Sequence, residues 1–227
     1  MTGAPQAQPG DVRWSLVVPV QDASRAKSRL DPPHPLSRPD LARAVARDTL
    51  ERVCRALPPR QVTVVTSDPA AARAARDLGA SVIDDPGRGL NAAIRVGLDA
   101  AAGADPATAG RAVLLGDLPA LQTHELVAAL TACTAHPAAF VPDADGTGTV
   151  LLSSTTGLPD PQFGPDSAAR HGEHATRLEL DLPGLRRDVD TAADLATALQ
   201  LGVGRHTASA LAPRGWAPDG GPPAWPH

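Results

Sequence analysis

The stretch AVLLGDLPAL, residues 112–121, runs from four apolar residues into a glycine, the carboxylate of Asp117 and a proline. A short apolar run that ends in turn-forming residues is typical of a strand buried on both faces of a parallel sheet. Similar segments recur along the chain, and we expect strands at 14–20, 61–67, 80–85, 112–117, 138–143, 148–154 and 185–190.

Segments with helical spacing of apolar residues separate several of these strands. We expect helices at 39–57, 69–78, 90–102, 123–133 and 191–201. Because parallel strands need a long crossover connection, usually a helix, this alternation predicts an α/β fold with a single doubly wound, mostly parallel, Rossmann-like sheet. The Pro/Gly-rich ends suggest a flexible N-terminal tail at 1–12, one domain at 13–205 and a disordered C-terminal tail at 206–227.

The composition argues against several classes of function. The chain has 227 residues, a net charge of −4 and only 2% aromatic residues, which disfavours binding to nucleic acid by a basic face or a stacking platform. No apolar run approaches the roughly 20 residues that cross a bilayer, and the N-terminus lacks the pattern of a signal peptide. The two cysteines, Cys54 and Cys133, form no metal motif. We therefore expect a cytoplasmic protein with no membrane or nucleic-acid partner.

The segment after the first strand, QDASRAKSRL (21–30), contains Arg25, Lys27 and Arg29. Ligands of such sheets bind outside the carboxyl ends of the strands, and these cations suit phosphate oxygens. The alternative is an ordinary solvated basic loop. The absence of a P-loop motif, and of G-x-G-x-x-G after the first strand, disfavours a P-loop NTPase and a dinucleotide dehydrogenase.

Asp117 follows a buried strand, where a hard cation could bind. Magnesium prefers one or two carboxylates together with substrate phosphates and water, although Asp117 could instead cap the following turn. Asp188 and Asp190 are two residues apart, so on the expected strand they share one face and are possible metal partners. Thr191 and Asp194 form the pattern of a helix capping box.

Three further segments contain turn residues near expected strand ends. In GRGLNAAI (87–94) the glycines would allow close approach of a flat ligand, and Asn91 could contact a base or cap a helix. In PDADGTGTVLL (142–152) and FGPDSAARH (163–171), backbone amides could form anion nests, or the segments are ordinary turns. His171 could pair with an anion or be a surface histidine.

The motifs VPV…AKSRL, GLNAAI, GDLPAL, GTGT…LL, FGPDSAARH and LRRDVDTAADL together resemble the phosphoenolpyruvate/2-phospho-L-lactate guanylyltransferase family of coenzyme F-420 biosynthesis. The resemblance covers about residues 13–203. It implies a GT-A/MobA-like nucleotidyltransferase domain that joins GTP to phosphoenolpyruvate, 2-phospho-L-lactate or 3-phosphoglycerate and releases pyrophosphate. The form of FGPDSAARH is most similar to members that use phosphoenolpyruvate. A downstream deazaflavin transferase would accept the unstable product.

The resemblance also implies roles for particular residues. Asp117 would ligate Mg²⁺, with Asp188 and Asp190 as candidates to complete the site. The acceptor would bind at Thr149, Gly164 and Ser167. Catalysis would involve Asp117, Lys27 and Arg29, and the nucleotide would bind at Pro19, Lys27, Gly89 and Asn91. Gln21 departs from the family pattern, which often has lysine after VPV, and this puts a triphosphate role at that position in doubt.

Two alternatives remain open at the level of sequence. One is a related nucleotidyltransferase with another nucleotide or acceptor, such as a sugar phosphate. The other is a non-catalytic nucleotide-binding module, which the presence of both Asp117 and Asp190 disfavours because a binding module needs no pair of metal-binding acids.

Overall fold

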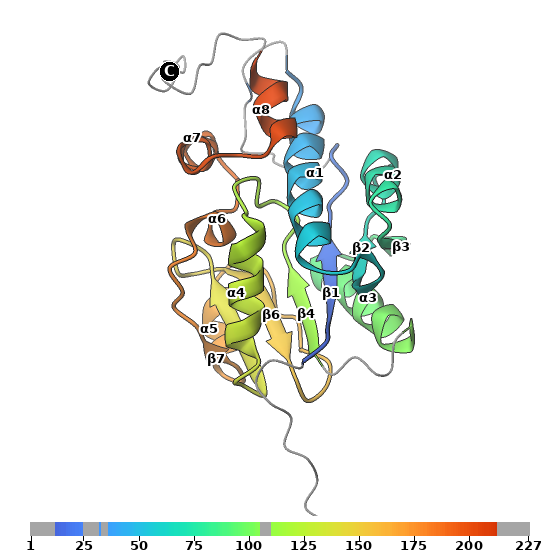
Figure 1. Cartoon of the computed structure of the whole chain (residues 1–227), viewed down its shortest axis with the longest axis vertical. Helices are drawn as coiled ribbons and strands as arrows, with labels where there is room; N and C mark the ends of the chain where they lie inside the picture. Colours follow the sequence, from blue (N-terminus) through green and yellow to red (C-terminus); the bar gives the residue numbers. More distant parts are fainter. Residues whose placement is uncertain (1–11, 25–31, 33–35, 105–109, 213–227) are drawn as a thin grey trace, which may run out of the picture.

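The computed structural model describes residues 12–24, 32, 36–104 and 110–212 of the chain (Figure 1). The described residues form a seven-stranded sheet in the order β3-β2-β1-β4-β6-β5-β7. All neighbouring strands are parallel except that β6 runs antiparallel to β4 and β5. The strands are β1 (Trp14–Pro19), β2 (Val62–Val65), β3 (Ser81–Ile83), β4 (Gly110–Leu114), β5 (Ala138–Pro142), β6 (Thr149–Ser154) and β7 (Thr176–Arg177).

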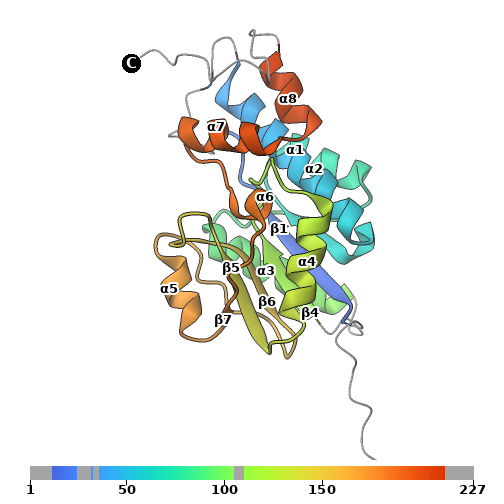
Figure 2. The same cartoon turned by 60° about the vertical axis from the view of Figure 1, so that its left-hand side comes forward.

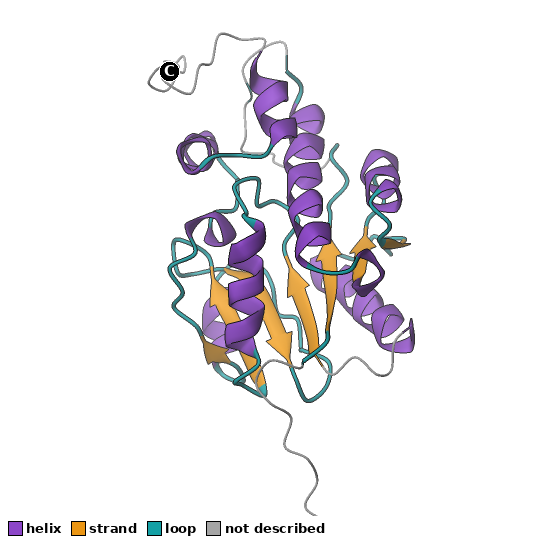
Figure 3. Cartoon of the chain, in the orientation of Figure 1, coloured by secondary structure: helices purple, strands orange, loops and turns teal. Residues whose placement is uncertain are grey.

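Helices lie on both sides of this sheet (Figure 3). The helices are α1 (Arg38–Ala56), α2 (Pro69–Asp77), α3 (Leu90–Ala104), α4 (Thr123–Cys133), α5 (Ser167–Gly172), α6 (Pro183–Arg186), α7 (Ala192–Leu201) and α8 (Arg205–Leu211), with a 3₁₀ turn, η1 (Pro59–Gln61). The five helices expected from the sequence are present close to their predicted limits. The mostly parallel α/β sheet is therefore confirmed.

The two faces of the sheet bury different sets of side chains. Leu16 and Val18 of β1 belong to the cluster packed under α1, α2 and α4, whereas Val17 belongs to the cluster under α3 and α5. This alternation follows from the two-residue period of a strand, and all three side chains are fully buried. Because both faces are covered, the strand is apolar except for the buried Ser15.

The expected strand at 185–190 is wrong. Pro183 starts the short helix α6, and the chain then continues as a loop. The N–H of Gly184 donates to a carboxylate oxygen of Glu125, and the N–H of Val189 donates to the carbonyl of Asp117. These hydrogen bonds hold the segment in place of the strand pairing that was expected. The last strand of the chain is instead β7, which consists of two exposed residues and pairs in parallel with β5. It has too few apolar residues to be recognised in the sequence.

All of helix α8 except its first residue, Arg205, lies in the segment that the sequence assigns to a C-terminal tail from residue 206. It packs beside α1, as both orientations of the cartoon show (Figure 2). The buried carboxylate of Asp48 in α1 accepts the N–H groups of His206 and Thr207, at 2.9 and 2.8 Å. Residues 206–211 are therefore folded, and that part of the tail prediction is wrong. The N-terminal tail to residue 11 and residues 213–227 lie outside the described residues.

Within the described segments, no helix is both long enough and apolar enough to cross a membrane.

Candidate functional site

A cavity of about 860 Å³ opens at the carboxyl ends of β1 and β4. The chain builds β2 and β3 on one side of β1 and then crosses to place β4 on the other side. Such a reversal of strand order leaves a crevice where ligands of open α/β sheets bind. Pro19 and Gln21 after β1, and Gly116 and Asp117 after β4, line the cavity. Its volume suits a nucleotide-sized ligand.

Gly116 allows the ends of β1 and β4 to come close together. A Cβ atom at this position would lie 2.8 Å from the backbone oxygen of Pro19 and 2.9 Å from a methyl carbon of Val20. Both distances are too short for a real Cβ atom, so a side chain here would push the two strand ends apart. The glycine therefore places Asp117 directly at the central crevice.

Asp117 does not cap the next helix, because α4 begins only at Thr123 and Glu125 accepts the N–H of Gln122 at its start. Instead, the carbonyl of Asp117 accepts the N–H of Val189 at 3.2 Å. This bond brings the loop that contains Asp188 and Asp190 to the end of β4. The three aspartates that the sequence singles out line the same cavity, although the two later ones lie on a loop and not on one face of a strand.

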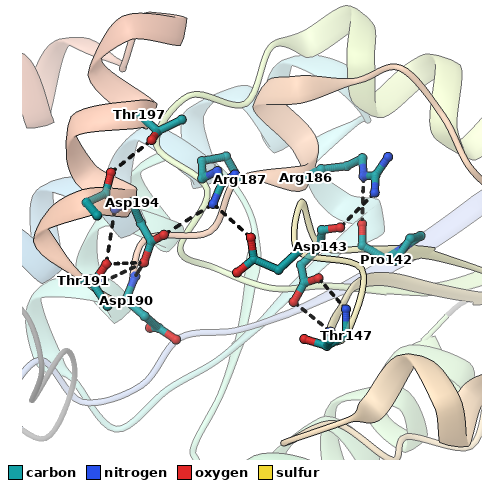
Figure 4. A network of polar contacts seen from close by, with 12 residues as sticks. Pro142, Asp143, Thr147, Arg186, Arg187, Asp190, Thr191, Asp194 and Thr197 are labelled. Carbon is teal, nitrogen blue, oxygen red and sulfur yellow. Dashed lines mark hydrogen bonds and ion pairs between the residues drawn. The ribbon is translucent and has the colours of Figure 1, made fainter.

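Arg187 holds this loop between two acidic segments (Figure 4). Its guanidinium lies 3.7 Å from Asp145 in the β5–β6 turn and 3.3 Å from Asp194 in α7. The other oxygen of Asp194 accepts the N–H groups of Asp190 and Thr191. The predicted capping box of Thr191 and Asp194 is therefore confirmed, and it also anchors the backbone of Asp190.

The β5–β6 turn uses its own amide groups. The carboxylate of Asp143 accepts the N–H groups of Thr147 and Gly148 at 3.0 and 2.8 Å, and Arg186 donates to the carbonyls of Pro142 and Asp143. The expectation that this turn forms an anion nest is wrong, because Asp143 already fills the position that an anion would take. The rigid turn still leads into Thr149 at the start of β6.

Thr149 and His171 form a buried pair beside the cavity. The Oγ1 atom of Thr149 lies 2.9 Å from Nδ1 of His171, and Nε2 of His171 accepts the N–H of Gln162 at 3.0 Å. The imidazole also packs edge-on to Phe163. Burial, with a smaller contribution from Arg170, lowers the pKa of His171 from 6.5 to about 4. His171 is therefore a buried neutral histidine and not a surface group.

The turn at 162–165 is fixed from two directions. The amide of Asn91 both donates to and accepts from the backbone of Phe163, at 3.0 and 2.8 Å. Arg170 donates to the carbonyls of Gln162 and Pro165. Gly164 lies in this turn with φ +126°, a conformation that favours glycine. The turn and the start of α5 bring Gly164 and Ser167 to the cavity that Thr149 also lines.

A family model for the MobA-like NTP transferase domain matches residues 41–163. A phosphoenolpyruvate guanylyltransferase from Geodermatophilus obscurus is 47% identical over 208 residues, which cover 87% of this chain and 94% of that protein. The phosphoenolpyruvate guanylyltransferase from Mycobacterium ulcerans is 44% identical over 219 residues, which cover 93% of this chain and 99% of that protein. The chain belongs to the phosphoenolpyruvate guanylyltransferase family. It is a nucleotidyltransferase of the MobA-like type.

Solved structures confirm the nucleotidyltransferase fold of this family member. Rv0371c from Mycobacterium tuberculosis superposes with a TM-score of 0.55 at 22% identity, over 82% of this chain and 97% of that chain. A cytidylyltransferase from Leptospira borgpetersenii superposes with a TM-score of 0.53 at 16% identity, over 84% and 87%. A structure of the M. tuberculosis protein in complex with manganese has a TM-score of 0.50 at 23% identity, over 82% and 98%.

The cavity of this guanylyltransferase-family chain is acidic. Every charged side chain among its described lining residues is an aspartate: Asp117, Asp143, Asp145, Asp166, Asp188, Asp190 and Asp194. No group of three His, Cys, Asp or Glu in the described part of the chain is close enough to hold a metal ion alone. The hard carboxylate oxygens fit a hard divalent cation that takes its remaining ligands from phosphates and water. A phosphorylated ligand would need such a cation to offset repulsion from the aspartates.

The predicted site residues divide into three groups. The residues that line the cavity are Pro19, Asp117, Thr149, Gly164, Ser167, Asp188 and Asp190. Gly89 and Asn91 are not among its lining residues, and the side chain of Asn91 instead holds the turn at Phe163. Lys27 and Arg29, like Arg25, lie outside the described residues.

The positioning roles of Asp143, Arg170 and Arg187 are not predicted from the sequence and emerge only from the structure. Asp143 and Arg170 bond to residues of their own segments, and Arg187 also reaches Asp145 in a segment distant in sequence. The best available signal was their occurrence inside the motifs FGPDSAARH, PDADGTGT and LRRDVDT, next to residues that were already candidates.

Proposed function

We propose that this protein transfers GMP from GTP to phosphoenolpyruvate, releasing pyrophosphate and forming enolpyruvoyl-2-diphospho-5'-guanosine for coenzyme F-420 biosynthesis. The names of relatives that share 44–47% of its sequence support this activity. The structural observation that carries it is one switch-point cavity lined by Asp117, Asp188 and Asp190 and also by Thr149 and Ser167. The acids provide a place for a metal-bound triphosphate, and the hydroxyl groups provide donors for a small anionic acceptor.

In the proposed reaction, a phosphate oxygen of the acceptor attacks the α-phosphorus of GTP. The new P–O bond forms as the bond to pyrophosphate breaks. The attacking oxygen is already ionised, so no general base is required, and no residue needs to remove a proton. The main barrier that the protein must lower is repulsion between two anions, which at an effective dielectric constant near 20 costs about 4 kcal/mol per pair of unit charges about 4 Å apart.

Carboxylates of this chain would hold the cation that offsets the repulsion. We assign Mg²⁺ to Asp117, with Asp188 and Asp190 as candidates to complete its protein ligands. When bound, the ion supplies charge neutralisation and alignment of the phosphates. Asp190 has a defined backbone position because its N–H donates to Asp194 at 3.2 Å.

The two substrates would occupy different parts of the cavity. Thr149, Gly164 and Ser167 would bind the phosphate and carboxylate of the acceptor. The nucleotide would lie against Pro19 and near Gly89, with Lys27 and Arg29 on its triphosphate. Asn91 would act on the nucleotide indirectly, because both polar atoms of its side chain already bond to Phe163. The domain extends to about residue 212 in this proposal, since α8 packs on α1.

Ala23, shortly after the end of β1, is held by a hydrogen bond to Asp68. Asp68 is buried at the start of α2, and its carboxylate accepts the N–H of Ala23 at 3.3 Å and the Nε–H of Arg43 at 3.1 Å. Two backbone N–H groups of α2, at Ala70 and Ala71, donate to its other oxygen. Despite burial, these donors lower the pKa of Asp68, so the carboxylate stays ionised at neutral pH.

The decisive experiment measures pyrophosphate release by the purified chain with a panel of substrates. GTP, ATP and CTP would each be combined with phosphoenolpyruvate, 2-phospho-L-lactate or 3-phosphoglycerate, with Mg²⁺ or with a chelator. We expect release with GTP and phosphoenolpyruvate only when a divalent cation is present. Turnover with ATP or CTP but not GTP would contradict the nucleotide assignment, and a clear preference for another acid would contradict the acceptor assignment.

The unstable product requires a coupled reaction. Adding the downstream deazaflavin transferase and its acceptor should convert the product as it forms and increase the yield. We propose that this transferase receives the product directly in the cytoplasm, where GTP and phosphoenolpyruvate are available.

A further inference from the structure

His171 is a buried side chain whose two ring nitrogens both have defined partners. The backbone N–H of Gln162 points at Nε2 from 3.0 Å, and a backbone N–H is only a donor. Nε2 must therefore accept with its lone pair. In a neutral imidazole the proton then resides on Nδ1, which lies 2.9 Å from Oγ1 of Thr149. The His171 ring thus donates to the hydroxyl of Thr149.

The protonation state agrees with this geometry. His171 is 3% exposed, and burial lowers its pKa to about 4, so the ring is neutral at physiological pH. A second ring proton would face the N–H of Gln162, which is an unfavourable donor–donor contact. Only one neutral tautomer satisfies both neighbours.

The consequence falls on the hydroxyl of Thr149. This hydroxyl accepts from His171, which leaves its own proton to be donated elsewhere. Thr149 lines the cavity, and His171 is the only side chain in the described part of the chain with which its hydroxyl forms a hydrogen bond. A hydroxyl held as a donor favours a ligand with an accepting oxygen, above all an anionic oxygen.

We propose that His171 is a positioning residue of the acceptor site, which fixes the Thr149 hydroxyl as a donor to an oxyanion of the acceptor. This inference rests on the proposed function, because it assigns a phosphate or carboxylate oxygen of the acceptor to Thr149. His171 does not touch the substrate. It acts through Thr149, and the same ring also supports the backbone of Gln162 next to the Gly164 turn.

Two amide substitutions separate these two contacts. His171→Asn places an amide N–H group near the position of Nδ1, so it retains a donor to Thr149 and loses the contact with Gln162. His171→Gln places an amide oxygen near the position of Nε2, so it retains an acceptor for Gln162 and loses the donor to Thr149. His174→Gln is the matched control, since His174 is exposed and close in sequence.

Steady-state kinetics with varied phosphoenolpyruvate and varied GTP provide the functional readout. We expect His171→Gln to raise KM for phosphoenolpyruvate about 10- to 100-fold, the effect of losing one hydrogen bond to a charged group, while KM for GTP stays within about 2-fold. His171→Asn should restore most of the loss. Thr149→Val should match His171→Gln, and the double variant should be no worse than Thr149→Val alone. The opposite order of the Asn and Gln variants, or equal increases of both KM values, would overturn the proposal.

A spectroscopic readout does not depend on turnover or on the stability of variants. Nitrogen-15 spectra of histidine-labelled wild-type protein distinguish the Nδ1–H from the Nε2–H tautomer. We expect Nδ1–H for His171, both alone and after addition of phosphoenolpyruvate, and the Nε2–H tautomer would refute the inference. If the protein binds phosphoenolpyruvate but does not turn over, the proposed function fails, and the dissociation constants of wild type and His171→Gln decide the role of His171. No binding of phosphoenolpyruvate at all would overturn both.

Discussion

Acidification from about pH 7.5 to about pH 5 should destabilise this protein through His171. The pKa of this ring is lowered from 6.5 to about 4 in the folded state. Between these two values the unfolded chain binds a proton that the folded chain does not, so the free energy of unfolding falls as the pH falls. The contribution of His171 to the free energy of unfolding is fully present above about pH 6.5 and is lost below about pH 4.

The magnitude follows from the two pKa values. Proton linkage gives a loss of about 2 kcal/mol at pH 5 and about 3 kcal/mol at the acid limit, at 1.36 kcal/mol for each unit of pKa difference. Glu51 and Asp68 also have lowered pKa values, with Asp68 held by its four hydrogen-bond donors. The contributions of these two carboxylates to the free energy of unfolding are lost mainly below about pH 4.5, because their unperturbed pKa values are 4.5 and 3.8. Between about pH 5 and 6.5 the effect of His171 is therefore isolated by comparing wild type with a variant that lacks this ring.

Urea unfolding followed by circular dichroism at several pH values measures this effect. Wild type and His174→Gln should each lose about 2 kcal/mol of the free energy of unfolding between about pH 7.5 and pH 5. His171→Gln does not titrate at this position, so its deficit relative to wild type should shrink by about 2 kcal/mol over the same range. An equal pH dependence of wild type and His171→Gln would refute the assignment of a buried, neutral ring.

Three further substitutions test the metal role of Asp117, the close approach of β1 and β4 at Gly116, and the anchoring of α8 by Asp48. Asp117→Asn should reduce magnesium-dependent pyrophosphate release by about 100-fold or more at unchanged melting temperature. The control Asp99→Asn, on the exposed face of α3, should leave both quantities unchanged. Near-normal activity of Asp117→Asn would exclude the metal role. Gly116→Ala should cost about 1–3 kcal/mol in urea unfolding because its Cβ would contact the end of β1, while Gly103→Ala, which meets no atom, should be neutral or stabilising. Asp48→Ala should cost about 2–4 kcal/mol and expose α8 to proteolysis, because two N–H groups lose their acceptor; unchanged protection would contradict that anchor.

Local patterns predict most of the regular structure of this chain. Strands such as β1 and β4 are mostly apolar because helices cover both faces of the sheet, so their burial is evident from a few consecutive residues. Asp117 could be placed at the crevice by the same reasoning, because it follows the carboxyl end of a strand, and ligands of parallel sheets bind at the carboxyl ends of the strands. The capping box at Thr191 is equally local, since it involves residues three apart.

The failures concern segments whose environment comes from distant parts of the chain. Val189 has the spacing of a strand residue, but it belongs to a buried cluster that includes Leu41 and Val45 of α1, and its N–H donates to the carbonyl of Asp117. Residues 206–211 follow a Gly-rich connection and resemble a tail, yet Asp48 supplies the acceptor that the first N–H groups of α8 need. Neither partner is visible in a local window.

The sequence by itself determined the α/β class, the place of Asp117 at a strand end and, through six motifs in order, the family. These properties depend on the spacing of residues within short segments. Only the tertiary structure decided the state of His171, which the sequence left open between an anion partner and a surface group. Its tautomer depends on Thr149 and Gln162 meeting one ring from two directions. A proton is placed by the partners that surround it in space, and a linear pattern does not record which partners those are.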